Sequence, residues 1–288
     1  MSTTGKTLRS LINARRGTLV PGAFNALSAR VIADLGFEAI YITGAGVTNM
    51  HIGLPDMGFM GLAEICEQTT RIRDAVDVPL LVDIDTGFGN ALNVYHSVRR
   101  IERAGADCVQ LEDQVSPKRC GHFNGKNVIG ADEMVGKIKA AVDARTSEDL
   151  LVMARTDCRA IDGFDAAIER AHQYREAGAD ILFVEALEST DEVRRLPELV
   201  DAPLLMNMVI GGKTPIANAD QLASFGYGLV LYANAALQGA VAGMQRALTV
   251  LREQRHLDEA PDLVAPFNER QRLVGKAFID ELEQRYKA

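Results

Sequence analysis

The sequence has no long apolar run, no closely spaced cysteine pair and no excess of basic residues, and each absence excludes a class of protein. A membrane-spanning helix needs about 18 or more consecutive apolar residues, and no run approaches that length. Four cysteines without CxxC spacing, at 66, 108, 120 and 158, indicate reduced thiols rather than a disulfide framework. The net charge of −8 argues against nucleic-acid binding, because nothing supplies a basic stripe.

The N-terminal segment is polar and carries no apolar stretch of the kind that a signal peptide requires. A mitochondrial transit peptide would normally place more residues before the first predicted strand. With reduced thiols and an acidic composition, we expect a cytoplasmic metabolic protein. We expect it to bind a small molecule and neither nucleic acid nor a membrane.

What the sequence does contain is a regular alternation of short apolar runs and amphipathic segments. Eight strands are predicted, at 19–24, 39–44, 80–85, 108–113, 150–156, 181–186, 203–208 and 228–232. The segments between them repeat apolar residues every third or fourth position, which is the helix period. Continuous apolar strands that alternate with helices indicate a parallel sheet covered on both faces. Eight such units predict an α/β fold of the (β/α)8 TIM-barrel type.

An open, doubly wound sheet is the alternative architecture. It is disfavoured because the first turn, at 19–29, has no glycine-rich GxGxxG pattern. No linker divides the chain, so we predict one domain over 1–288. The segment from Met244 onward is helical and longer than one barrel helix requires. A helix that packs on a neighbouring subunit would explain this excess, so we expect an oligomer.

Reactive side chains are densest in the segment 112–126, where Lys118, Arg119, Cys120 and His122 lie together. Cationic neighbours favour the ionised form of a thiol. A thiol that can exist in both forms suits acid–base catalysis. A buried, inert cysteine is the commoner alternative, but this loop is too polar to belong to a core.

Acidic residues gather where the predicted strands end, which is where barrel enzymes carry their chemistry. Asp83 and Asp85 are two residues apart and so share a face of one strand. With Glu112 on the next strand they predict a divalent cation site, because carboxylates at one place repel each other without a cation. Mg²⁺ is the expected ion, and Asp56 is a plausible outer partner. The alternatives are solvated strand-end acids and a turn aspartate.

Other strand ends carry groups that could bind an anionic substrate. Arg155 lies in an apolar run and needs an anionic partner. That partner is a substrate carboxylate, Glu185, or both. Asn207 is either a ligand for a carboxylate or a satisfied core amide. The small-residue turn at 43–45, made of Thr43, Gly44 and Ala45, could bind an anionic oxygen through its N–H groups.

These residues form motifs that resemble the isocitrate lyase and phosphoenolpyruvate mutase superfamily, from about Leu8 to the C-terminus. The motifs are KRCGH at 118–122, VDIDTGFGN at 82–90, QLEDQ at 110–114, MARTD at 153–157 and NM…GGKTP at 207–215. The resemblance implies a (β/α)8 barrel, dependence on Mg²⁺ with Mn²⁺ as a substitute, and a mobile loop that carries the cysteine. It also implies homotetramers, built from dimers that exchange a C-terminal helix.

Within the superfamily, the KRCGH loop is typical of carbon–carbon lyases, and the isocitrate lyases themselves are much longer. The 2-methylisocitrate lyases have a motif similar to NxTEFG after the seventh strand, whereas this chain has Val209 and Ile210 there. Two apolar side chains would leave a third carboxylate of the substrate without a polar partner. This favours the 2,3-dimethylmalate lyase group and a hydroxy dicarboxylate substrate. A 2-methylisocitrate lyase, an oxaloacetate hydrolase and a non-catalytic binding protein remain the alternatives.

The resemblance also implies roles for the candidate residues in a retro-aldol cleavage. Asp83 would hold Mg²⁺, with waters bound to the acids at 56, 85 and 112, and Arg155 with residues 43–45 would bind the carboxylate of the pyruvate-forming half. Tyr41 is a candidate base for the 2-hydroxyl proton, and Cys120 would protonate the carbanion. Lys118, Arg119 and His122 would tune the thiol and neutralise the product carboxylate. Glu185 and Asn207 would shape the far end of the pocket.

Overall fold

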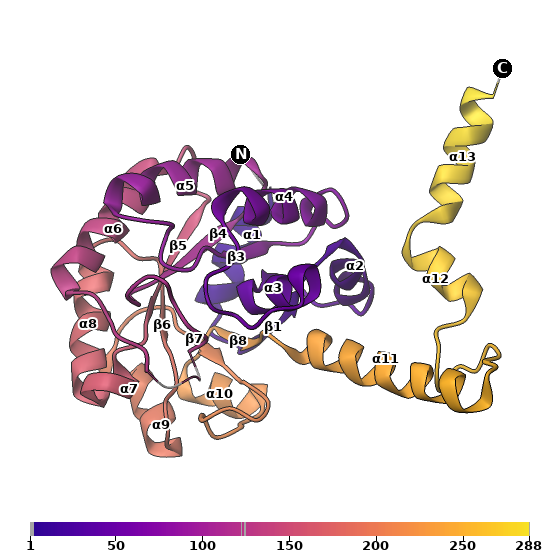
Figure 1. Ribbon diagram of the computed structural model, residues 1–288. Helices are drawn as coiled ribbons and strands as arrows, with labels where there is room; N and C mark the ends of the chain where they lie inside the picture. The colour runs from indigo at the N-terminus through magenta and orange to yellow at the C-terminus, as the bar shows by residue number, and fades with distance from the viewer. Residues whose placement is uncertain (1–2, 122, 124, 288) are drawn as a thin grey trace.

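The computed structural model describes residues 3–121, 123 and 125–287, and eight parallel strands form its centre (Figure 1). The strands are β1 (Thr18–Ala23), β2 (Ile40–Ile42), β3 (Leu80–Asp83), β4 (Cys108–Glu112), β5 (Leu151–Thr156), β6 (Ile181–Val184), β7 (Leu205–Asn207) and β8 (Leu229–Tyr232). Their order is β6-β5-β4-β3-β2-β1-β8-β7. A parallel bridge between Leu182 and Leu204 joins the two ends of this order. The predicted (β/α)8 barrel and its eight strands are confirmed.

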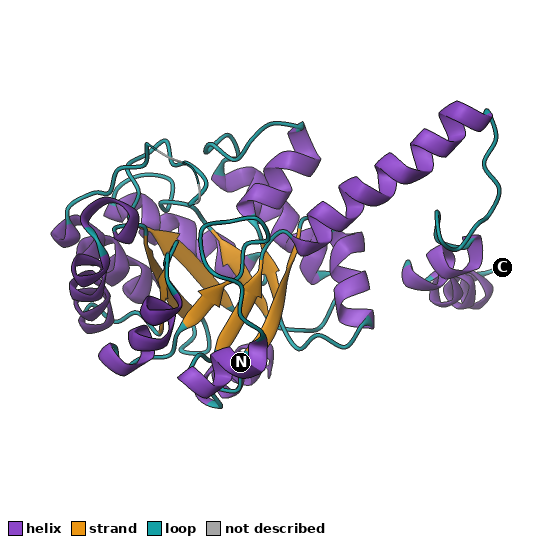
Figure 2. Cartoon of the chain, turned by 90° about the horizontal axis from the view of Figure 1, so that it is seen from below, coloured by secondary structure: helices purple, strands orange, loops and turns teal. Residues whose placement is uncertain are grey.

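Helices surround the strands, as Figure 2 shows in the perpendicular view. They are α1 (Thr3–Asn13), α2 (Ala26–Asp34), α3 (Gly44–Ile52), α4 (Leu62–Arg73), α5 (Ala91–Arg103), α6 (Ala131–Ala144), α7 (Arg159–Asp162), α8 (Phe164–Glu176), α9 (Thr190–Leu199), α10 (Ala219–Phe225), α11 (Ala235–Gln254), α12 (Phe267–Leu273) and α13 (Lys276–Tyr286). Over the described ranges, none of these helices is long and apolar enough to cross a membrane.

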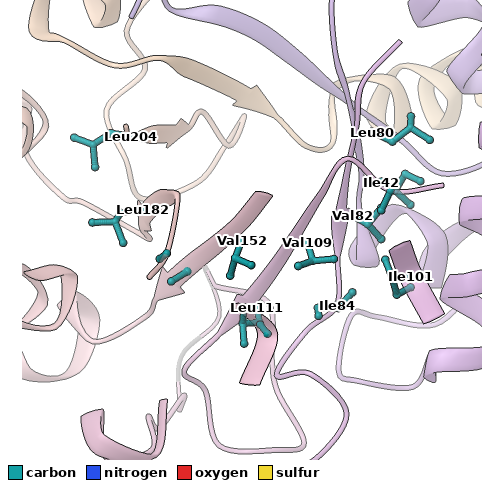
Figure 3. Packing of buried hydrophobic residues seen from close by; sticks show 14 of the residues in the cluster. Ile42, Leu80, Val82, Ile84, Ile101, Val109, Leu111, Val152, Leu182 and Leu204 are labelled. Carbon is teal, nitrogen blue, oxygen red and sulfur yellow. The ribbon is translucent and has the colours of Figure 1, made fainter. Parts of the chain in front are cut away.

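The strands bury both faces, because successive side chains along a strand point to opposite sides. Val82, Val109 and Val152 face the helices and belong to the larger apolar cluster, part of which is shown in Figure 3. Leu81 and Met153 belong to a second cluster, with which Leu8 and Ile12 of α1 also pack. The second face therefore forms the barrel interior. Two residues after Leu81 and Met153, the same alternation places Asp83 and Arg155 on that interior face.

The helix α11 leads away from the barrel, and α12 and α13 lie beyond it (Figures 1 and 2). The apolar side chains of Met244 and Leu248 on α11 are 46% and 60% exposed, and Phe278 on α13 is 61% exposed. The chain returns toward the barrel at α12, where Arg272 pairs with Asp34 of α2 at 2.6 Å. The helix α11 thus leaves its own barrel and exposes apolar side chains, and whether it packs on a neighbouring subunit stays a prediction.

The end of β4 is tied to its neighbours by Asp113, a strand-end acid that is fully buried. Its Oδ2 accepts hydrogen bonds from Thr156 Oγ1 at 2.7 Å, Tyr174 Oη at 2.7 Å and Arg170 Nη1 at 3.1 Å. Its Oδ1 accepts one from the N–H of Asp157 at 2.9 Å. These bonds join β4, β5 and α8. Burial raises the pKa of the Asp113 carboxyl, against these donors, which favour its ionised form.

Replacing Tyr174 by phenylalanine removes one donor from Asp113 and keeps the ring. We expect the free energy of unfolding to fall by about 1–3 kcal/mol, the cost of weakening one buried, charge-assisted hydrogen bond. Urea denaturation followed by circular dichroism measures the change, with Tyr286→Phe on the exposed C-terminal helix as the control. Equal stability of the two variants would contradict the role of Tyr174 in this tie.

Candidate active site

One small cavity opens at the carboxyl ends of the strands and collects most of the predicted site residues. Its volume is about 40 Å³, room for a few ordered waters rather than for a dicarboxylate. Admitting a substrate therefore requires the surrounding loops to move. The lining residues are Tyr41, Thr43, Ala45, Asp56, Asp83, Cys120, Gly121, Arg155, Phe183, Glu185, Asn207, Val209, Leu231, Ala233 and Asn234.

Lys118 occupies the middle of the acidic cluster. Its Nζ lies 2.6 Å from Oδ1 of Asp56 and 2.8 Å from Oδ1 of Asp85. Burial opposes this charge, but the surrounding carboxylates, Asp85 first, outweigh burial and hold the pKa of Lys118 well above its ordinary value. The sequence predicted that Lys118 would act on the thiol. Instead, two carboxylates hold this ammonium.

The acidic side chains around Lys118 outnumber the cationic side chains that face them. Burial, together with Asp83 and Asp56, raises the pKa of Asp85 to about 7 in spite of Lys118. Burial also raises the pKa of Glu112 well above its usual range, although Arg155 opposes the shift. Within the described residues, Oε1 of Glu112 is buried without a hydrogen-bond partner. With all of its acids ionised, the acidic cluster would have more negative charge than its cationic side chains compensate, and the raised pKa values are the result of that imbalance and of burial.

A divalent cation suits this imbalance. Oδ2 of Asp83 accepts a hydrogen bond from the N–H of Gly44 at 3.2 Å, and Oδ1 accepts one from the N–H of Asp85 at 3.1 Å. This holds the carboxylate of Asp83 at the cavity wall. In the part of the chain that is described, no three His, Cys, Asp or Glu side chains converge closely enough to hold a metal by themselves. Mg²⁺, which binds few carboxylates directly and keeps several waters, fits such an open set.

Arg155 is buried at the centre of a second charge cluster. Its guanidinium contacts Glu112 at 3.1 Å, Glu185 at 3.5 Å and Asp157 at 2.9 Å, and it lies over the ring of Phe183. Burial opposes its charge, but the carboxylates, led by Asp157, raise the pKa of Arg155 well above its usual value. The expected pairing with Glu185 is present, and Arg155 also lines the cavity where a substrate carboxylate would lie.

The segment 43–45 is the beginning of α3, a helix that the sequence did not predict. Thr43 is the N-cap, and its Oγ1 accepts a hydrogen bond from the N–H of Gly46 at 3.3 Å. A helix N-terminus favours an anion through its N–H groups and its dipole. The N–H of Gly44 donates to Asp83 and the N–H of Thr43 donates to the carbonyl of Ala23 at 3.2 Å, so two of the three predicted donors already have partners in this structure.

Tyr41 lines the cavity but lies in surroundings that disfavour a basic role. Its hydroxyl donates a hydrogen bond to Oε1 of Gln110, and its residue is almost fully buried. Burial first, and then the negative charge of Asp83, raise the pKa of the phenol well above its ordinary value. The phenol therefore keeps its proton at neutral pH, and it suits a role as donor better than a role as general base.

The loop that carries Cys120 lies against the acidic cluster and Arg155. The N–H of Cys120 donates to the carbonyl of Asp56 at 3.2 Å, and the half-buried thiol lines the cavity. The side chain of Arg119 is exposed and does not belong to the described lining of the cavity. His122 lies outside the described residues. The four cysteines remain thiols.

The far end of the cavity is formed by residues that follow β7 and β8. The Nδ2 of Asn207 donates to Oε2 of Glu185 at 3.2 Å, while its Oδ1 has no hydrogen-bond partner among the described atoms. Val209 lines the cavity. Ile210, predicted to do the same, is 49% exposed and outside the described lining, because the chain turns outward after Val209.

Several residues at or beside the site were missed in the sequence, Asp157, Lys126, Gly121 and Asn234 among them. Asp157 lies two residues after Arg155, and that spacing on a strand was a signal that both share a face. Lys126 belongs to the segment that already contained the cysteine. Gly121 and Asn234 gave no signal of their own, because their position depends on how two loops meet.

Comparison with known proteins gives the same superfamily along nearly the whole chain. Residues 8–252 match the family described as phosphoenolpyruvate phosphomutase. The 2,3-dimethylmalate lyase of Eubacterium barkeri is 42% identical, and the alignment covers 99% of each chain. The 2-methylisocitrate lyase of Aeropyrum pernix is 47% identical over 86% of this chain and 79% of that protein.

Two solved structures extend the comparison to related chemistry. An oxaloacetate acetylhydrolase bound to 3,3-difluorooxalacetate superposes with a TM-score of 0.92 at 32% identity, covering 98% of this chain and 97% of that one. A phosphonopyruvate hydrolase in complex with oxalate and Mg²⁺ superposes with a TM-score of 0.89 at 28% identity, covering 99% of this chain and all of that one.

Proposed function

The chain belongs to the phosphoenolpyruvate phosphomutase family, within the PEP mutase/isocitrate lyase superfamily, and we propose that it is a carbon–carbon lyase for a 2-hydroxy dicarboxylate such as 2,3-dimethylmalate. The observation that carries the proposal is the composition of one cavity. It brings together a thiol, Cys120, a buried guanidinium, Arg155, and an apolar side chain, Val209. The full-length similarity to a 2,3-dimethylmalate lyase supports the same substrate class.

Binding would place the pyruvate-forming half of the substrate between Arg155 and α3. The guanidinium supplies a planar donor pair for a carboxylate, and the N-terminal turn of α3 supplies the N–H of Ala45 and a favourable dipole. The exclusion of water from so small a cavity strengthens both interactions. Tyr41, whose single hydroxyl proton is donated to Gln110, lines the cavity.

The acidic cluster would hold Mg²⁺, or Mn²⁺ in its place, through Asp83 directly and through waters on Asp56, Asp85 and Glu112. The ion, when bound, stabilises negative charge on the substrate 2-oxygen as a Lewis acid. Lys118 compensates part of the acidic charge in the present arrangement, with its Nζ between Asp56 and Asp85. Its place among the acids is the feature that most supports a cation site there.

The reaction would break the bond between C2 and C3. A general base accepts the 2-hydroxyl proton, and the electron pair of the broken O–H bond then forms the C2 carbonyl, which releases pyruvate. The electrons of the broken bond go to C3, next to the second carboxylate, and give an enediolate. The Cys120 thiol would then donate its proton to C3 as general acid, which yields propionate from 2,3-dimethylmalate.

The distal pocket favours a methyl group over a further carboxylate. Val209 is the residue after the β7 end that lines the cavity, and an unpaired carboxylate against it would be costly. The similarity to 2-methylisocitrate lyases and to oxaloacetate acetylhydrolase leaves two alternative reactions to test. Cleavage of 2-methylisocitrate would give pyruvate and succinate, and hydrolysis of oxaloacetate would give the products of adding water to that substrate.

A coupled pyruvate assay with Mg²⁺ tests the proposed function. We expect faster turnover of 2,3-dimethylmalate than of 2-methylisocitrate, with oxaloacetate hydrolysis followed in parallel. Cys120→Ala should lower kcat by about 10²- to 10⁴-fold, the usual loss on removal of a general acid, whereas Cys66→Ala, away from the cavity, should not. Preference for 2-methylisocitrate would overturn the substrate assignment, and full activity of Cys120→Ala would overturn the role of the thiol.

Metal removal gives a separate measurement. Mg²⁺ added to chelator-treated protein should raise Tm, since an ion at 100 times its Kd stabilises by about 2.7 kcal/mol. Asp83→Asn should abolish this shift, and Asp191→Asn, on the exposed part of α9, should preserve it. Full activity after exhaustive chelation would exclude the metal.

The subunits would assemble into a homotetramer through the C-terminal helices. The exposed apolar side chains of α11 and α13, Met244, Leu248 and Phe278 among them, need cover that their own barrel does not give. We place the protein in the cytoplasm, where its four cysteines remain reduced.

A charge on the apolar face of α11 should weaken this assembly. We expect Leu248→Asp to shift the protein to smaller species in size-exclusion chromatography with light scattering, because burying Leu248 contributes about 1.5–3 kcal/mol at each copy. Gln254→Asp, at an exposed polar position of the same helix, is the control. A wild-type protein that elutes as a monomer would contradict the proposal.

A further inference from the structure

A buried lysine that the mechanism above does not use ties the Cys120 loop to the barrel. The Lys126 residue is 7% exposed. Its Nζ lies 2.7 Å from Oδ1 of Asp157 and donates to the carbonyl oxygen of Gly121. Gly121 directly follows Cys120, so the ammonium holds the carbonyl of the residue next to the one that carries the thiol.

The carboxylate of Asp157 serves two cations at once. Its Oδ2 accepts a hydrogen bond from Arg155 Nε at 2.9 Å, and its Oδ1 accepts one from Arg155 Nη2 at 3.0 Å in addition to the contact with Lys126. Asp157 itself is fully buried, and its N–H donates to Asp113. One fixed carboxylate thus positions the substrate-binding guanidinium and the anchor of the cysteine loop together.

The loop backbone lies directly on this guanidinium. A Cβ added at Gly121 would come within 2.3 Å of Arg155 Nη2 and 2.6 Å of Glu185 Cγ, so no side chain fits there. Such an approach needs an attraction that holds the peptide in place. The bond from Lys126 to the Gly121 carbonyl supplies it, with the charge of Lys126 balanced by Asp157.

We propose that Lys126 is a positioning residue that, anchored by Asp157, holds Cys120 in register with the substrate carboxylate on Arg155. The inference rests on the proposed function, because it assigns Lys126 to the delivery of the Cys120 proton. Lys126 does not touch the substrate and acts through the Gly121 peptide. Its loss misplaces the thiol while Arg155 keeps three carboxylate partners.

Steady-state kinetics separate this role from a structural one. Lys126→Met should lower kcat by about 10- to 100-fold, the loss expected when a catalytic group moves by about 1 Å, with KM changed less than threefold. Lys126→Arg, which keeps the charge and a donor, should recover most of kcat. Tyr174→Phe, which weakens the Asp113 tie without touching the loop, should lose stability and keep its kcat.

A second readout needs no substrate, so it stands even if the proposed function fails. Iodoacetamide labelling of the folded full-length protein, with the site located by mass spectrometry, reports how Cys120 is held. We expect labelling of Cys120 in Lys126→Met to change at least fivefold from wild type, and in Tyr174→Phe to remain unchanged. Cys108, fully buried in the barrel, is the internal reference.

Wild-type kcat together with a wild-type labelling rate in Lys126→Met would overturn the proposal. The proposal would also be overturned if Tyr174→Phe, at the same loss of stability as Lys126→Met, showed the same fall in kcat. If Lys126→Met does not fold, the Asp157→Asn variant is measured in its place. The amide removes the negative charge that balances Lys126, and its oxygen still accepts a hydrogen bond from Arg155. A changed Cys120 labelling rate in Asp157→Asn supports the proposal, and an unchanged rate overturns it.

Discussion

A guanidinium buried at the end of the barrel is the constraint on which the rest of the site depends. Burying the charge of Arg155 is costly unless it is paired and hydrogen-bonded, and three carboxylates at 2.9–3.5 Å meet that need. Their own charges then require compensation. Lys126 balances Asp157, whereas Glu112 keeps an oxygen without a partner in the described structure. The excess of acid next to Asp83 is thus a consequence of how this guanidinium is held, and a metal cation would suit it.

The barrel meets this constraint with polar residues at strand ends and with two loops. Strand alternation turns Asp83, Glu112 and Arg155 inward, and their apolar neighbours along the same strands turn toward the helices. The loop before α4 brings Asp56, and the loop after β4 brings Lys118 and the thiol. Because Lys118 lies between Asp56 and Asp85, the two loops and β3 are joined by charge rather than by apolar packing.

The site and the proposed assembly of subunits share one helix. Ala233 and Asn234, just before α11, line the cavity, while the body of α11 exposes apolar side chains away from the barrel. Packing of that helix against another subunit would fix the orientation of its first turn, and with it one wall of the pocket. The proposed assembly would therefore link the shape of the pocket to the quaternary structure.

The sequence by itself determined the architecture and most members of the site. Short apolar runs identified the strands and the 3.6-residue period identified the helices between them. Parallel strands with one inner face had to bring Asp83, Glu112, Arg155, Glu185 and Asn207 to one end of the barrel. The pairings of those groups were decided by the tertiary structure. Lys118 pairs with acids of two other segments, Asp157 is divided between Arg155 and Lys126, and Ile210 turns out to solvent while Val209 turns in. The reason is physical: side-chain direction in a strand follows from a local period, whereas loops have no period. The contacts of a loop depend on where distant strands place their charges.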